Sequence, residues 1–71
     1  MSLYDYRSSL KILREDYLFY ALIMAAMRRA DTDNLNRLKI AFPDTWNELK
    51  ERYNAPGGII KSDGIEGKES E

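Results

Sequence analysis

The chain contains neither cysteine nor histidine. Without cysteine it has no disulfide bond and no thiolate ligand that would stabilise a small fold. Without histidine it lacks the side chain that most often serves as a general base or a zinc ligand. These absences remove the commonest hydrolytic and metal-dependent chemistries. We therefore predict no catalytic residues, no metal site and no cofactor, and we expect the protein not to be an enzyme.

Glycine and proline are few as well, with four and two residues. No glycine-rich phosphate loop is present, because the Gly57–Gly58 pair follows a predicted helix instead of opening one. The polar segment 31–36 has a superficial similarity to a calcium loop, but its sixth position is Asn36 instead of glycine and its twelfth is Phe42 instead of glutamate. Helix capping and turn formation account for these side chains.

The sequence also has no excess of charge of either sign, with 11 basic and 12 acidic residues and a net charge of −1. Domains that bind nucleic acid usually carry a basic patch or stripe. Residues 28–53 include a possible helix-turn-helix, yet they hold six basic and five acidic groups. The composition therefore argues against nucleic acid as a partner.

What the chain does have is a run of eleven consecutive apolar residues at 17–27, YLFYALIMAAM. Acidic residues precede it (Glu15, Asp16) and arginines follow it (Arg28, Arg29). A membrane-spanning helix needs about 20 apolar residues, and a signal peptide carries positive charge on its N-terminal side. We therefore expect no membrane association and a cytoplasmic protein.

Apolar residues recur at alternating spacings of four and three from Tyr6 to Met27, which is the pattern of a heptad repeat. This pattern predicts one continuous helix over about residues 5–29. On such a helix the apolar run is hydrophobic on every side. Its three stripes are Tyr17, Tyr20, Met24 and Met27; Phe19, Ile23 and Ala26; and Leu18, Leu22 and Ala25.

The rest of the chain predicts two short helices, at about 33–41 and 44–54, separated by Pro43. Residues 59–71 have the composition of a flexible acidic tail. We thus predict an all-α fold in a single domain over residues 1–58. One long N-terminal helix has two short helices packed against it, which makes a three-helix mini-bundle followed by a disordered tail.

Helix lengths then predict self-association. A helix of about 24 residues is roughly 36 Å long, whereas two helices of nine or ten residues reach about 14 Å each. The short helices cover at most two stripes of the apolar half, and an uncovered apolar stripe usually marks an interaction site. We expect a homo-oligomer, with a symmetric dimer as the simplest form. The predicted interface residues are Tyr6, Leu10, Leu13, Leu18, Leu22 and Ala25.

Three segments, FYALIMAAMRRADTDN, FPDTW and RYNAPGG, give the part from Phe19 to Gly58 a resemblance to a group of small uncharacterised bacterial proteins. These are associated with prophages and integrative conjugative elements. The resemblance implies an accessory protein of a mobile element. It carries over no catalytic or binding residue.

The favoured hypothesis is a non-enzymatic interaction module that self-associates through its first helix. Two alternatives remain open at the level of sequence. One is a DNA-associated regulator that uses the helix-turn-helix at 33–53. The other is an inhibitor or adaptor in which a helix of a host protein covers the free stripe. The sequence does not fix the partner, the oligomer number, the helix orientation, or whether residues 1–12 are helical without a partner.

Overall fold

The computed structural model describes residues 2–63, and within this range the chain is helical with no strand. The α-helices are α1 (Leu3–Arg14), α2 (Phe19–Arg29), α3 (Thr32–Ala41) and α4 (Pro43–Tyr53). Two short 3₁₀ helices follow, η1 (Pro56–Gly58) and η2 (Lys61–Asp63). The predicted all-α class is confirmed. None of the described helices is both long enough and apolar enough to cross a membrane.

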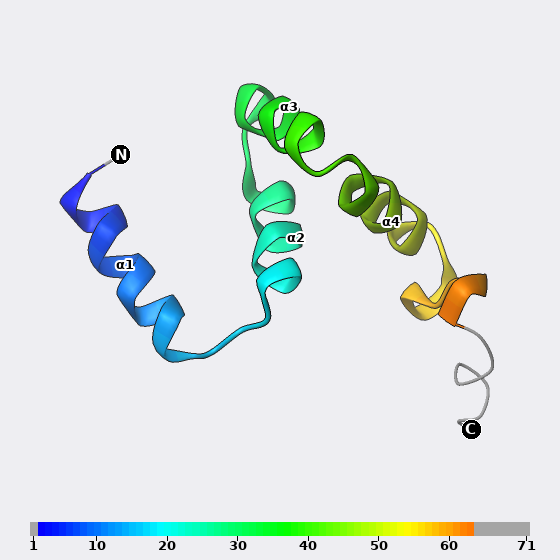
Figure 1. Ribbon diagram of the computed structural model, residues 1–71, viewed down its shortest axis with the longest axis horizontal. Helices are drawn as coiled ribbons and strands as arrows, with labels where there is room; N and C mark the ends of the chain where they lie inside the picture. Colours follow the sequence, from blue (N-terminus) through cyan, green and yellow to red (C-terminus); the bar gives the residue numbers. More distant parts are fainter. Residues whose placement is uncertain (1, 64–71) are drawn as a thin grey trace.

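The prediction of one long helix over residues 5–29 is wrong. The helix ends at Arg14, and a linker of four residues, 15–18, leads to α2. Asp16 adopts a left-handed conformation with φ of 55°, and Leu18 is extended. In Figure 1, α1 runs down to this linker and α2 runs back up, so that the two helices form an open hairpin.

Local chemistry supports this break. Aspartate tolerates the left-handed region better than most residues and is a weak helix former. The N–H groups of Glu15 and Asp16 donate to the carbonyls of Ile12 and Leu13 over 3.0 Å, which tightens the last turn of α1. The apolar spacing does not reveal the break. A linker of four residues is close to one helical turn, so the alternation of four and three continues unchanged from α1 into α2.

The beginning of α1 agrees with its sequence. Ser2 and Asp5 form a capping box: Ser2 Oγ accepts the Asp5 N–H, and the Asp5 carboxylate accepts the Ser2 N–H, both at 3.1 Å. These bonds satisfy two of the N–H groups that a helix start leaves unpaired. They define where α1 begins without attaching it to the rest of the protein.

A small core lies in the C-terminal part of the fold. α2 packs against α3 and α4, and α3 packs against α4. The buried apolar residues are Met27 of α2, Leu49 of α4, and Ile60. The three-helix bundle therefore consists of α2, α3 and α4. Only the second half of the predicted long helix, α2, takes part in it.

A single residue joins α3 to α4. Phe42 caps the end of α3 and the start of α4, and Pro43 occupies the first position of α4. Proline suits that position because its missing N–H would be unpaired there in any case. The Phe42 ring contacts the Phe19 ring edge-on at 5.9 Å between centroids, which ties this corner to the start of α2.

The folded part extends beyond residue 58, where we expected the domain to end. Arg52 binds Asp63 through two hydrogen bonds of 2.7 and 2.8 Å, and it also donates to the Gly58 carbonyl. Together with the burial of Ile60, these bonds attach η1 and η2 to α4. The remainder of the predicted tail, residues 64–71, lies outside the described residues.

The described part of the chain is open. Its Cα radius of gyration is 14.8 Å, whereas a compact domain of this length has about 11 Å. The reason is visible in Figure 1, where α1 stands apart from the bundle formed by α2, α3 and α4. No residue of α1 is buried.

Candidate functional site: the groove between α1 and α2

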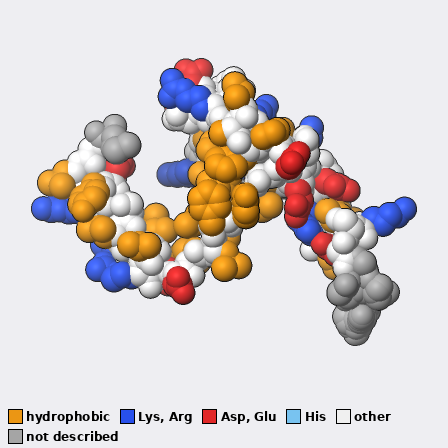
Figure 2. All heavy atoms as spheres, viewed as in Figure 1, with side chains coloured by type: hydrophobic (Ala, Val, Ile, Leu, Met, Phe, Trp, Pro, Cys, Tyr) orange, Lys and Arg blue, Asp and Glu red, His pale blue; other side chains and the backbone are white. Residues whose placement is uncertain are grey.

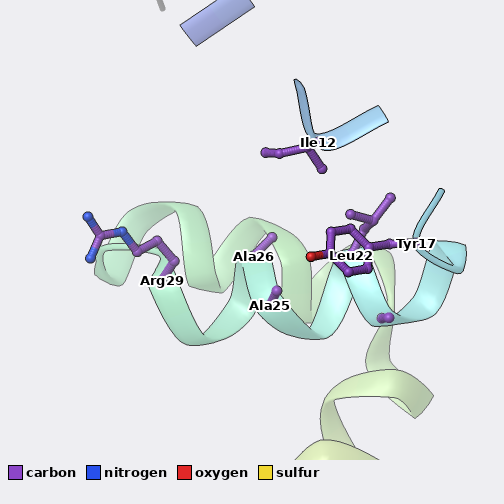
Figure 3. Close-up of a pocket in the computed structure, with 7 residues that line it drawn as sticks. Ile12, Tyr17, Leu22, Ala25, Ala26 and Arg29 are labelled. Carbon is purple, nitrogen blue, oxygen red and sulfur yellow. The ribbon is translucent and has the colours of Figure 1, made fainter. Parts of the chain in front are cut away.

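An apolar groove of about 650 Å³ lies between the end of α1 and one face of α2 (Figure 3). α1 contributes one lining residue, the linker another, and α2 the remainder. Ile12 faces α2 across the groove in the close-up view. The lining residues are Ile12, Tyr17, Ala21, Leu22, Ala25, Ala26 and Arg29.

The two faces of α2 have different roles. Met27 lies on the side turned to α3 and α4 and is only 3% exposed. The groove residues lie on the opposite side, since positions 22, 25 and 29 are about half a turn away from position 27 on a helix. Three of the lining residues on this face are alanines. Small side chains allow the axis of a second helix to approach closely.

Exposed apolar side chains gather in the N-terminal part of the molecule. Within the described residues, thirteen large hydrophobic side chains are exposed, and ten of them lie between Leu3 and Tyr20. Figure 2 shows hydrophobic atoms along α1 and over the start of α2. Single exposed apolar residues are ordinary, but a continuous apolar surface usually marks an interaction site. Ile12 and Tyr17 belong both to this set of exposed side chains and to the groove, whereas Leu3 and Leu10 lie on the side of α1 opposite Ile12.

The structure places the predicted interface residues in two groups. Leu22 and Ala25 line the groove. Tyr6, Leu10 and Leu13 are exposed on α1, and Leu18 is 80% exposed in the linker. The structure therefore brings two of the six together and leaves the other four on the surface beside them.

Sequence reasoning missed five of the groove residues, namely Ile12, Tyr17, Ala21, Ala26 and Arg29. On one continuous helix Ile12 and Tyr17 belong to stripes that the short helices were expected to cover. A chain reversal at residues 15–18 changes which side chains face each other. The aspartate at position 16 was the one local feature that pointed to a break, because it is a weak helix former.

Arg29 is the one charged residue that lines the groove, and it forms no ion pair within residues 2–63. It lies at the C-terminal end of α2, where the helix dipole favours positive charge. On α1, Asp5 is seven residues before Ile12 and so lies on the same face as Ile12. Each of the two helices thus carries one charge on its groove-facing side, and the two charges are opposite.

A second surface combines aromatic rings with basic side chains. Lys39 Nζ lies 4.7 Å and Lys50 Nζ 6.0 Å from the centroid of the Trp46 ring, and the Arg28 guanidinium lies 5.8 Å from that of Tyr53. Each such contact stabilises an exposed site by about 0.5–1 kcal/mol. In these contacts the basic side chains bind aromatic rings of the same molecule. We therefore assign them a structural role.

The strongest electrostatic contact is the one around Arg52. Two hydrogen bonds that the Arg52 guanidinium donates, together with one from the Ile60 N–H, lower the pKa of Asp63 to about 2. The same contact with Asp63, and a second one with Glu48, raise the pKa of Arg52. Arg52 was one of the two basic residues of a possible DNA-reading helix. Two carboxylates bind its guanidinium, so this side chain is not available to a phosphate.

Within residues 2–63, no group of three or more acidic side chains is placed to hold a metal ion. The chemistry that the groove offers is therefore apolar contact with a charge at one end. Comparison with known protein families, with characterised proteins and with solved structures finds no match to this chain.

Proposed function

We propose that this protein is a non-enzymatic helical interaction module that self-associates through the apolar surface of α1 and the groove face of α2. The observation that carries the proposal is α1 itself. It is an amphipathic helix of twelve residues, none of them buried. Isolated helices shorter than about 12–15 residues are marginal in water. Such a helix needs a partner, and the described part of its own chain does not cover it.

The energy available is sufficient for association. Full burial of one Leu or Ile side chain contributes about 1.5–3 kcal/mol. Leu10, Ile12 and Leu13 are exposed on α1, and Leu18 follows in the linker. Burial of several of these side chains would offset the loss of translational and rotational freedom, about 4–15 kcal/mol, that association requires. A second copy brings an identical set of side chains, which makes a symmetric dimer the simplest assembly.

The resemblance of residues 19–58 to small proteins of prophages and conjugative elements gives the proposal a context. In that context the module would act in the bacterial cytoplasm as an accessory protein of a mobile element. The DNA-binding alternative is weaker, because Arg52 is held by Glu48 and Asp63. A host helix in place of a second copy remains the main competitor.

Sedimentation equilibrium at micromolar concentration tests the proposal. We expect the protein to be a dimer or larger, and Leu22→Lys to weaken the association by about 2 kcal/mol or more, roughly thirtyfold, because it places a charge in an apolar contact. Ile40→Lys is the matched control, since Ile40 is 83% exposed on α3 and lies outside the groove. A wild-type protein that stays monomeric at all concentrations would rule the proposal out.

A further inference from the structure

We propose that α1 of one copy docks into the α2 groove of a second copy, antiparallel to that α2, with Asp5 of one copy against Arg29 of the other. This inference rests on the proposed self-association and adds its partner segment, its orientation and its register. The dimer is then an exchange of N-terminal arms between two open hairpins.

The dimensions of the two helices fit this arrangement. α1 has 12 residues and α2 has 11, so both are about 17–18 Å long. The floor of the groove holds alanines at positions 21, 25 and 26, which leave room for a helix. Ile12 already faces this floor from the edge (Figure 3). An α1 helix from another copy can present the same face to the same floor.

The register follows from helical spacing. Asp5 and Ile12 are seven residues apart on α1, and Leu22 and Arg29 are seven residues apart on α2. Seven residues are almost two turns, so each pair lies on one face and spans about 10 Å. In an antiparallel pair of helices, Ile12 set against Leu22 therefore brings Asp5 to Arg29.

Charge selects the antiparallel orientation. Both helices have acidic residues at their N-terminal ends, Asp5 for α1 and the Glu15–Asp16 pair before α2. Both have basic residues in their last turns, Arg14 in α1 and Arg29 in α2. Antiparallel docking sets each acidic end against a basic end and aligns the helix dipoles favourably. Parallel docking would set like charges together.

The linker explains why the arm docks onto a second copy. The left-handed Asp16 and the extended Leu18 hold α1 away from α2 of its own chain. Two copies in this open form can exchange arms and cover both grooves at once. Exchange of an identical element is a low-cost route to a dimer. In the product, each α1 packs against the α2 of the other copy and not against its own.

Two charge reversals, studied singly, together and as a mixture, test the inference by sedimentation equilibrium. Asp5→Arg alone sets arginine against Arg29, and Arg29→Asp alone sets aspartate against Asp5. We expect each to weaken self-association roughly tenfold or more. An equimolar mixture of the two single variants restores both opposite-charge contacts in the heterodimer, so we expect it to associate roughly tenfold more tightly than either single variant alone. The double variant should do the same.

The other outcomes overturn the inference in distinguishable ways. If the double variant recovers and the mixture does not, α1 closes on its own chain. If neither single variant changes the association, the register is wrong. Both results leave the proposed self-association intact, whereas a monomeric wild type rejects that proposal itself. Ser2→Ala is the control for the loss of the capping box in Asp5→Arg, and we expect it to weaken association less than Asp5→Arg does.

Discussion

Residues 2–18 and residues 19–63 contain similar fractions of apolar residues, 8 of 17 and 21 of 45, but differ in how many of them are buried. In the C-terminal region, three helices cover one another, and Met27, Leu49 and Ile60 are buried. In the N-terminal region, α1 and the linker bury no side chain, and they hold eight of the thirteen exposed large hydrophobic side chains of the described residues. Hydrophobic content alone therefore does not decide burial in a chain of this length. An apolar side chain is buried only where another helix packs against it.

The largest expected difference between the regions is in their sensitivity to core truncation. Met27→Ala should lower the free energy of unfolding by about 2–5 kcal/mol, because Met27 is 3% exposed and its truncation leaves a cavity in the core. Leu13→Ala should change it by less than about 0.5 kcal/mol in the monomer, because Leu13 is 73% exposed. Urea denaturation at low protein concentration measures both. Equal losses of unfolding free energy in the two variants would show that α1 packs against the bundle of α2, α3 and α4.

A second difference between the regions concerns the loss of stability at low pH. The lowered pKa of Asp63 contributes stability that is fully present above the ordinary carboxyl pKa and is lost as the pH falls towards about 2. We expect Asp63→Asn to lower the melting temperature at pH 7 and to remove the part of the pH dependence that lies between about 4 and 2. Glu51→Gln, which changes an exposed carboxylate on the same helix as Arg52, serves as control. A wild-type protein whose stability does not fall with pH in this window would contradict the Arg52–Asp63 contact.

A third difference between the regions concerns how much helix each retains when the protein is diluted. If α1 is held by a second copy, it should unfold when the dimer dissociates, while α2, α3 and α4 stay helical. We expect the circular dichroism at 222 nm to weaken on dilution by no more than the share of α1, with Leu22→Lys showing the weaker signal at every concentration. A signal that is independent of concentration in both proteins would mean that α1 is stable alone.

The smallest expected effect lies at the boundary between the regions. A left-handed conformation costs a β-branched residue about 1–2 kcal/mol, and aspartate less. Asp16→Val should therefore shift the hinge towards a continuous helix, while Asp16→Gly should keep it, since glycine adopts this conformation without strain. Because the chain has no cysteine, spin labels at Arg7→Cys and Asn47→Cys report the distance between α1 and α4 without interference. Identical distances in the two variants would show that Asp16 does not control the hinge.

Local patterns in the sequence were enough to predict several features. The predicted start of the first helix, at about residue 5, lies two residues from the observed start at Leu3. Pro43 separates α3 from α4, and the described residues 2–63 are all-α as expected. These features depend on side chains and backbone groups within a few residues of one another. Contacts of that range are readable from spacing.

The candidate site was only partly predictable. Leu22 and Ala25 were found because a fully apolar segment must leave one side uncovered, whichever way the chain turns. Ile12 and Arg29 were missed because they share a groove only after the chain reverses at the linker. The attachment of Asp63 to Arg52 was missed for a similar reason, since it joins residues eleven positions apart across two glycines.

The sequence by itself determined the helical class, the amphipathic faces and the surplus of apolar surface over what two short helices can cover. Only the tertiary structure decided that the long apolar helix is two helices, and that its uncovered side is a groove facing α1. The physical reason is that the choice between a continuous and a broken helix at Asp16 involves about one residue's conformational energy, about 1–2 kcal/mol. Packing of α2 against α3 and α4 involves far more, and it acts through contacts that no local pattern contains.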